Sequence, residues 1–112
     1  MSNKNSKELQ ALIMHEGDEK YIIAEHEDRI ALVSMAIDYH RGIMRAYRKQ
    51  TDSQFTVNGG GILSIDHATK RIETYGSSGA YGEPDEDLVR HILEASYPTY
   101  LIDAKVTDYV RG

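Results

Sequence analysis

The chain of 112 residues contains no cysteine. This absence excludes a disulfide framework, a thiolate nucleophile and a cysteine metal site, and it fits a reducing compartment. The sequence also lacks an apolar run of membrane-spanning length, and residues 1–7 are polar where a secretory signal would be apolar. We therefore expect a cytoplasmic protein without a membrane partner.

Positive charge is in short supply. The 13 Lys and Arg residues are outnumbered by 18 Asp and Glu residues, which gives a formal net charge of -5 at pH 7. Affinity for nucleic acid comes from many Lys and Arg side chains that neutralise phosphates. No nucleic-acid partner is expected, whereas a site for an isolated phosphate remains compatible with this balance.

The length suits a single domain, because a chain of this size buries roughly two-thirds of the surface that its unfolded form exposes. Residues 1–8 are interpreted as a flexible polar tail and residues 9–112 as the domain. No apolar stripe in the sequence requires a second copy, so we expect a monomer.

The apolar pattern predicts an α/β fold of the α+β type, with a single mixed β-sheet of about five or six strands flanked by two main α-helices. Short β-rich runs separated by polar turns predict an edge strand, two hairpins, a short strand between the hairpins and a last strand. These runs lie at residues 9–13, 21–24, 30–33, 55–57, 62–65, 71–75 and about 100–106.

The boundary between strand and helix is ambiguous in residues 30–47, because apolar positions there also recur at spacings of three and four. We place a strand up to residue 33 and a helix over about 35–49, ended by the polar residues 50–53. A second helix is expected where Pro84 and acidic residues mark a start and Pro98 marks a stop.

The glycine- and serine-rich loop 76–82 is a candidate anion site. A backbone that binds an anion through its N–H groups needs small side chains, ideally just before a helix. Ser78, Gly79 and Ala80 meet that need. An ordinary connection between strand and helix would have the same composition.

His40 occupies a position where the helical pattern would place an apolar residue. Its ring is therefore expected to face inward or toward a cleft. An imidazole with an ordinary pKa of about 6.5 can act as a general base or nucleophile. A core histidine with no chemical role is the alternative.

Four cations could serve an anion site. Lys20 precedes a β-rich run, and Arg41, Arg45 and Arg48 share one predicted helix face directly after His40. They could attract a phosphorylated partner, or the arginines could form a solvated face near the negative end of the helix.

The other histidines and the acidic turn do not indicate a further site. His15, His26, His67 and His91 lack metal-ligand spacing, so neither a metal nor another cofactor is expected. The carboxylates of residues 25, 27 and 28 lie at a hairpin tip and are interpreted as solvated charges rather than a catalytic pair.

Several motifs in order, over roughly residues 18–103, resemble the Janus/Ocnus family of small phosphohistidine phosphatases. The most specific is a triple glycine followed by a hairpin and then Tyr-Gly-x-Ser-x-Ala-Tyr-Gly. The matching segments are residues 20–23, Asp38-Tyr39-His40, residues 59–64, residues 75–82 and Tyr97-Pro98.

The resemblance implies a mixed sheet of about six strands with two helices. It also implies metal-independent hydrolysis of the phosphorus–nitrogen bond of phosphohistidine in proteins. By resemblance, His40 falls on the catalytic histidine and Lys20 on a lysine that contacts the substrate. Ser78, Gly79 and Ala80 fall on the loop whose backbone holds the phosphate.

One position departs from the family pattern. The better-known animal members carry an arginine directly after the triple glycine, where this chain has Ile62. Arg41 or Arg45 could supply an auxiliary phosphate contact from the helix. The alternatives are a hydrolase of small phosphoramides or phospholysine, and a non-catalytic module that binds a phosphorylated partner.

Overall fold

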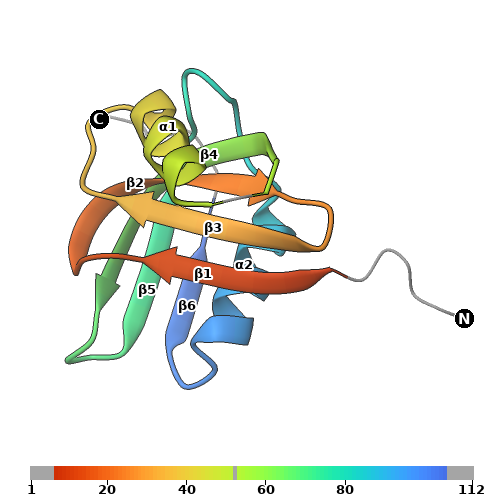
Figure 1. Cartoon of the computed structure of the whole chain (residues 1–112). Helices are drawn as coiled ribbons and strands as arrows, with labels where there is room; N and C mark the ends of the chain where they lie inside the picture. Colours follow the sequence, from red (N-terminus) through yellow and green to blue (C-terminus); the bar gives the residue numbers. More distant parts are fainter. Residues whose placement is uncertain (1–6, 52, 106–112) are drawn as a thin grey trace, which may run out of the picture.

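One mixed sheet of six strands, with a helix on each face, forms the protein (Figure 1). The structure is a computed structural model that describes residues 7–51 and 53–105. The strand order is β1-β3-β2-β4-β5-β6, in which β1 pairs with β3 and β5 with β6 in parallel and the other neighbours are antiparallel. The predicted α+β fold is confirmed. The elements are β1 (Glu8–Ile13), β2 (Gly17–Glu25), β3 (Arg29–Met35), α1 (His40–Gln50), β4 (Thr56–Asp66), β5 (Arg71–Tyr75), α2 (Glu86–Ser96) and β6 (Leu101–Ala104).

The two faces of the sheet carry separate apolar cores, because successive strand residues point to opposite sides. In β2, Tyr21 and Ile23 are buried on the α2 side, and Ile22 and Ala24 are buried on the α1 side. The α2 side also contains Leu63 and Ile65 of β4 and Ile72 of β5. Lys20 lies two residues before Ile22 in β2, so its side chain points to the same side of the sheet, the α1 side.

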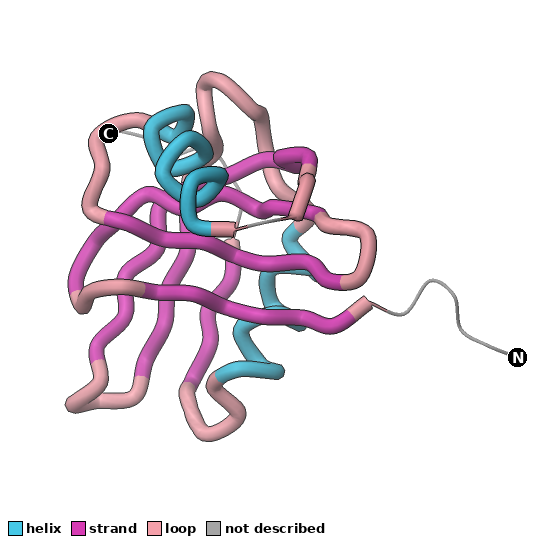
Figure 2. Tube along the Cα trace, viewed as in Figure 1, coloured by secondary structure: helices cyan, strands magenta, loops and turns pink. Residues whose placement is uncertain are grey.

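The sheet curls around α2. Both edge strands, β1 and β6, contact this helix, and the Ala11 N–H donates to Ser96 Oγ at 3.0 Å (Figure 2). By contrast, α1 packs mainly on the central strands β2 and β3, and its first residue also contacts β4. Neither helix in the described ranges has the length and apolar character needed to cross a bilayer.

The N-terminal prediction needs two corrections. Strand β1 begins at Glu8, inside the predicted tail, and Lys7 Nζ lies 2.8 Å from a carboxylate oxygen of Glu25. Glu25 is therefore half-buried and ion-paired, rather than a solvated charge at the hairpin tip. Residues 1–6 of the predicted tail lie outside the described residues.

The helix predicted from about residue 35 begins later, at His40. The reason is strand pairing: β3 continues to Met35, which lies opposite Lys20 in β2. Residues 36–39 then form a connection that turns the chain onto the sheet. As a result, His40 is the first residue of α1 rather than an internal one.

The triple glycine, predicted to follow a short strand, lies inside the long strand β4. Gly60 and Gly61 pair with Ile22 and Tyr21 of β2, and the register shifts between Ile22 and Ala24. This irregularity has one extra residue on β4, the pattern of a β-bulge, and Gly59 has a φ of 93° there. Phe55 lies just outside the strand.

The remaining elements agree with the sequence. Strands β4 and β5 form the predicted hairpin, and α2 ends at the residue before Tyr97-Pro98. Asp85 caps α2, because its side chain accepts from the N–H groups of Asp87 and Leu88. Strand β6 covers 101–104, and position 106 of the predicted strand lies outside the described residues.

Candidate functional site

An open cavity of about 640 Å³ lies at the N-terminal end of α1. Four segments of the chain surround it: the middle of β2, the start of α1, the middle of β4 and the loop after β5. Figure 2 shows this loop beside the start of the helix. The cavity is lined by Lys20, Tyr39, His40, Arg41, Gly42, Arg45, Ile62, Ser77, Gly79 and Ala80. The structure therefore brings together the predicted His40, Lys20, Gly79, Ala80, Arg41 and Arg45.

His40 is fixed against the sheet by a backbone contact. Its side chain is buried, with 8% of the residue exposed, and Nε2 lies 3.0 Å from the carbonyl oxygen of Gly61. The ring also packs on Gly60, where an added Cβ would lie 3.0 Å from His40 Cδ2. The lack of a side chain at Gly60 thus allows the imidazole to approach β4 closely.

The partner of Nε2 determines the tautomer of the neutral ring. A carbonyl oxygen only accepts, so Nε2 carries the hydrogen and donates to Gly61. The lone pair then belongs to Nδ1, for which no hydrogen bond exists within the described residues. Among the described residues, only Tyr21 Oη is a side-chain nitrogen or oxygen that is both buried and without a hydrogen bond, so an unpaired His40 Nδ1 is not buried. His40 Nδ1 is therefore accessible to solvent.

The surroundings of this imidazole favour its neutral form. Burial lowers the pKa of His40, and the nearby positive charge of Lys20 lowers it further, while the hydrogen bond to Gly61 acts in the opposite direction. The net pKa lies below the ordinary value. A neutral ring with an accessible Nδ1 can accept a proton or attack an electrophile.

The first turn of α1 offers unsatisfied backbone donors. The N-cap residue Tyr39 has extended backbone angles but makes no capping hydrogen bond with its side chain, and the first turn has no acidic residue. The N–H groups of His40 and Arg41 have no hydrogen-bond partner within the described residues. Such a helix end favours an anion.

The loop 76–82 is a tight turn, in which Ser78 and Gly82 exchange backbone hydrogen bonds of 3.1 and 2.7 Å. Ser78 is buried, and its Oγ accepts from the N–H groups of Ala80 and Tyr81 at 3.2 and 3.0 Å. Ser78 thus holds the conformation of the loop through these hydrogen bonds and does not line the cavity.

This geometry leaves fewer backbone N–H groups of the loop free to bind an anion than the sequence predicts. The N–H groups of Ser78 and Ala80 are already used within the loop. The Gly79 N–H has no partner among the described residues, and Gly79 is exposed and lines the cavity. The loop also precedes α2 by several residues, so the helix end beside it is that of α1.

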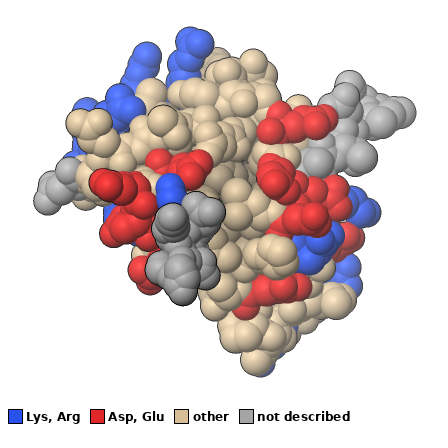
Figure 3. Space-filling model, turned by 90° about the vertical axis from the view of Figure 1, so that its right-hand side faces the viewer, with Lys and Arg blue, Asp and Glu red and all other residues tan. Residues whose placement is uncertain are grey.

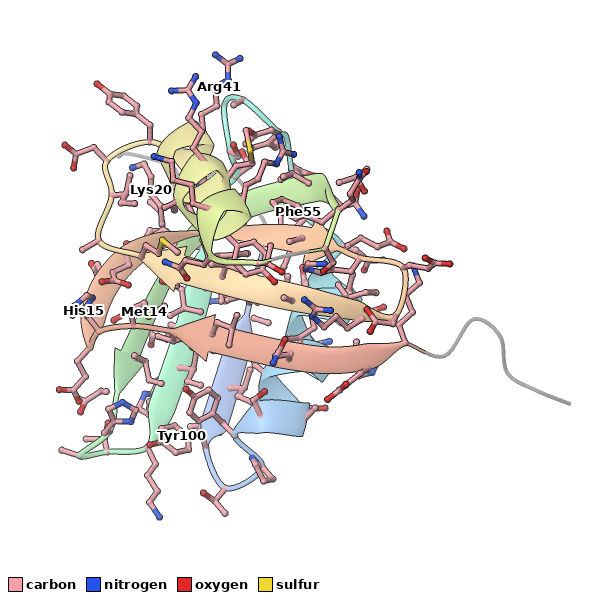
Figure 4. All side chains as sticks on the ribbon, viewed as in Figure 1. Met14, His15, Lys20, Arg41, Phe55 and Tyr100 are labelled. Carbon is pink, nitrogen blue, oxygen red and sulfur yellow. The ribbon has the colours of Figure 1, made fainter. Side chains whose placement is uncertain are left out.

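Among the described residues, three cations and no carboxylate line the cavity. Lys20 is half-buried on β2, and Arg41 and Arg45 are exposed one turn apart on α1. Figure 4 shows Lys20 on the sheet below α1 and Arg41 at the top of the helix. Arg48, predicted on the same face, lies elsewhere: its guanidinium is 5.1 Å from the centre of the Phe55 ring.

None of these three cations has an ion pair within residues 7–51 and 53–105. In contrast, other cations of the chain are matched with carboxylates at 2.8–3.5 Å. The paired cations are Lys7, Arg29, Arg71, Arg90 and Lys105. The cavity therefore gathers three cations that have no carboxylate partner among the described residues.

The other titratable clusters lie away from the cavity. No group of three His, Asp or Glu residues in the described chain is placed to hold a metal ion. His15 pairs with Glu19, and His67 contacts Tyr100. His26 is buried with Tyr47 and Ser53 under the far end of α1.

Sequence reasoning missed three parts of the site. The Gly61 carbonyl that orients His40 is a backbone group, so no residue type signals it. Ser77 lines the cavity, but its residue type does not distinguish it from the other small residues of the loop. The lack of a capping side chain at Tyr39 was visible in the sequence, but only with the correct helix start.

The fold and the cavity define a small α+β protein with a cationic site around a neutral histidine. The Janus/Ocnus family model matches residues 7–101. The chain belongs to this family. None of the curated proteins compared with the chain matches it.

Proposed function

We propose that the protein is a metal-independent protein-histidine phosphatase that hydrolyses the phosphorus–nitrogen bond of phosphohistidine. The observation that carries this proposal is the position of His40. Its accessible Nδ1 lies at a cavity whose charged side chains, within residues 7–51 and 53–105, are all cations. Membership of the Janus/Ocnus family adds to the case, because the resemblance implies this activity.

The phosphoryl group would be held by charge and by backbone donors. Lys20, the Gly79 N–H and the first N–H groups of α1 are available to its oxygens. Arg41 and Arg45 are auxiliary contacts from the helix, in keeping with the position of Ile62 on the cavity wall. Phosphoryl transfer depends mainly on such positioning and on stabilisation of the charge that develops on these oxygens.

In the chemical step, His40 Nδ1 takes a proton from water while the water oxygen bonds to phosphorus. The phosphorus–nitrogen bond breaks, and its electron pair stays with the imidazole of the substrate, which leaves as a neutral ring because its other nitrogen carries a proton. A general base of this kind typically contributes about 100- to 10,000-fold in rate. Direct attack of Nδ1 on phosphorus, giving a phosphohistidine on His40 that water then hydrolyses, uses the same atoms.

Ile62 favours a second candidate, a module of the same fold that binds a phosphorylated protein without turnover. This half-buried side chain lines the cavity where the better-known animal relatives carry an arginine. A hydrolase of small phosphoramides or phospholysine is the other alternative, because an anion site leaves the rest of the ligand open.

The test measures phosphate release from a phosphohistidine-bearing protein and from phosphoramidate, with metals chelated. Wild type is compared with His40→Ala. We expect turnover of the protein substrate in the wild type and a loss of about 100-fold or more in the variant. Turnover of phosphoramidate alone would select the small-molecule hydrolase, and binding without turnover by folded wild type would select the binding module.

A further inference from the structure

The arrangement of charge around the cavity indicates what lies next to the phosphoryl group of the ligand. A single phosphoryl group can be held by Lys20 and the backbone donors near His40. Arg41 and Arg45 provide additional charge farther out. Both are exposed, and because they are four positions apart in the helix, they lie about 6 Å apart along its axis.

The two arginines occupy positions that do not favour the helix itself. Arg41 lies in the first turn, where the helix dipole favours negative side chains. Arg45 follows four residues later, a spacing at which like charges repel. Neither forms an ion pair with a described residue, so no ion pair in this part of the chain, residues 7–51 and 53–105, accounts for them.

The rim of the cavity also carries an exposed aromatic side chain. Tyr39 is 75% exposed, one of the large hydrophobic residues of the described chain that are most open to solvent. Aromatic and arginine side chains together are typical of surfaces that bind another protein. A small phosphoramide would not extend to such a rim.

None of the described Asp or Glu residues lines the cavity. In the side view of Figure 3, several Lys and Arg side chains gather along the upper left edge, whereas Asp and Glu lie below them on the left and over the right, beside other Lys and Arg. With a net charge of -5, the chain is more acidic than basic. The cationic rim is thus a local feature that can steer and orient an acidic partner.

We propose that the rim formed by Tyr39, Arg41 and Arg45 binds an acidic stretch of polypeptide beside the phosphorylated histidine of the substrate protein. This inference rests on the proposed function for the identity of the phosphorylated residue. The acidic side chains contact the two arginines, while the phosphoryl group enters the cavity at Lys20 and His40.

The experiment measures binding, so that it does not depend on turnover. Two labelled peptides carry the same stable phosphohistidine analogue, one flanked by Glu and the other by Gln at the same positions. Wild type is compared with Arg41→Gln/Arg45→Gln. The control is Lys49→Gln, which removes one positive charge from the last turn of α1, away from the cavity.

We expect wild type to bind the acidic peptide about three- to tenfold more tightly than the neutral one, as two exposed ion pairs would provide. The preference should disappear in the double variant, persist in the control and weaken with added salt. Equal affinities in the wild type, or a preference that survives in the double variant, would overturn the inference. If wild type prefers the acidic peptide but releases no phosphate from a phosphohistidine-bearing protein, this inference is supported and the phosphatase proposal is contradicted.

Discussion

His40 Nε2 lies 3.0 Å from the carbonyl oxygen of Gly61. This contact joins the first residue of α1 to the middle of β4, and it directs the ring hydrogen into the sheet. Because the carbonyl accepts, the basic nitrogen is Nδ1, on the side that solvent reaches. The orientation and tautomer of the proposed catalytic group are thus set by a backbone atom.

The first prediction concerns the pH dependence of phosphate release. A protonated His40 cannot act as a base, so kcat/KM should fall as the pH decreases through the pKa of His40. Burial and Lys20 lower this pKa, so the fall should lie below about pH 6.5, the ordinary value. A pH profile of wild type checks this.

Replacement of Lys20 tests the electrostatic part of that account. In Lys20→Met, the acid limb should move to higher pH, because a positive charge that lowers the pKa of His40 is removed. Loss of a charged phosphate contact should also reduce kcat/KM, by roughly 10- to 100-fold. An acid limb at the same pH as in wild type would show that Lys20 does not act on His40.

The second prediction concerns the uncapped end of α1. Tyr39 has the extended angles of an N-cap residue, so Tyr39→Asp should cap the helix and raise the free energy of unfolding by about 1 kcal/mol. The new carboxylate should also occupy the N–H groups and repel anions. Thermal unfolding with and without inorganic phosphate measures both effects.

In wild type, phosphate should raise the unfolding temperature, and in Tyr39→Asp it should do so much less. Tyr39→Phe is the control, since it keeps the ring and adds no cap. Equal stabilisation of Tyr39→Asp and wild type by phosphate would contradict an anion site at this helix end.

Much of the fold could be predicted because local signals agreed with tertiary packing. The β4–β5 hairpin has a polar turn between two β-rich runs, and α2 begins and ends at strong signals. The start of α1 could not be predicted in the same way. Ile30 and Val33 fit a helical spacing by coincidence, whereas pairing with β2 keeps this segment in a strand as far as Met35.

The site was predictable as a set of side chains but not as an arrangement. His40, Lys20 and Gly79 were candidates from the sequence and line one cavity in the structure. The sequence did not reveal that Ser78 Oγ occupies the Ala80 N–H, or that Gly61 orients His40. Those features depend on backbone atoms whose positions follow only from the folded chain.

The third prediction compares two glycines. In Gly60→Ala, the new Cβ would collide with the Tyr21 carbonyl oxygen and press on His40 Cδ2. We expect a loss of about 1–3 kcal/mol in stability and a displaced His40 ring. In Gly79→Ala, nothing lies within 4 Å of the added Cβ, so stability should be preserved.

Denaturant unfolding measures the stabilities of the two glycine variants, and phosphate release under conditions where both are folded measures the site. Gly60→Ala should be the less active of the two. If Gly60→Ala matched the wild type in both measurements, the close approach of His40 to β4 would not be required.

The fourth prediction concerns the second buried histidine. His26 is 2% exposed, and its ring nitrogens lie 2.7 Å from Tyr47 Oη and 3.0 Å from Ser53 Oγ. Burial and the charge of Arg29 lower the pKa of His26. The unfolded chain therefore binds a proton at higher pH than the folded one.

Stability from this source is present above about pH 6.5, the ordinary histidine value, and is lost as the pH falls through the lowered pKa. His26→Gln should flatten this part of the curve of unfolding free energy against pH. His91→Gln, an exposed change on α2, should keep the wild-type slope. A slope in His26→Gln equal to that of wild type would rule out this contribution.

The protonation state of His40 tests the central claim most directly, and long-range proton–nitrogen NMR of its ring measures it. Loss of signals in His40→Gln would assign them. At about pH 7, we predict a neutral ring with the hydrogen on Nε2 and an unprotonated Nδ1. A hydrogen on Nδ1, or an imidazolium at that pH, would contradict the assignment of His40 as the base that activates water.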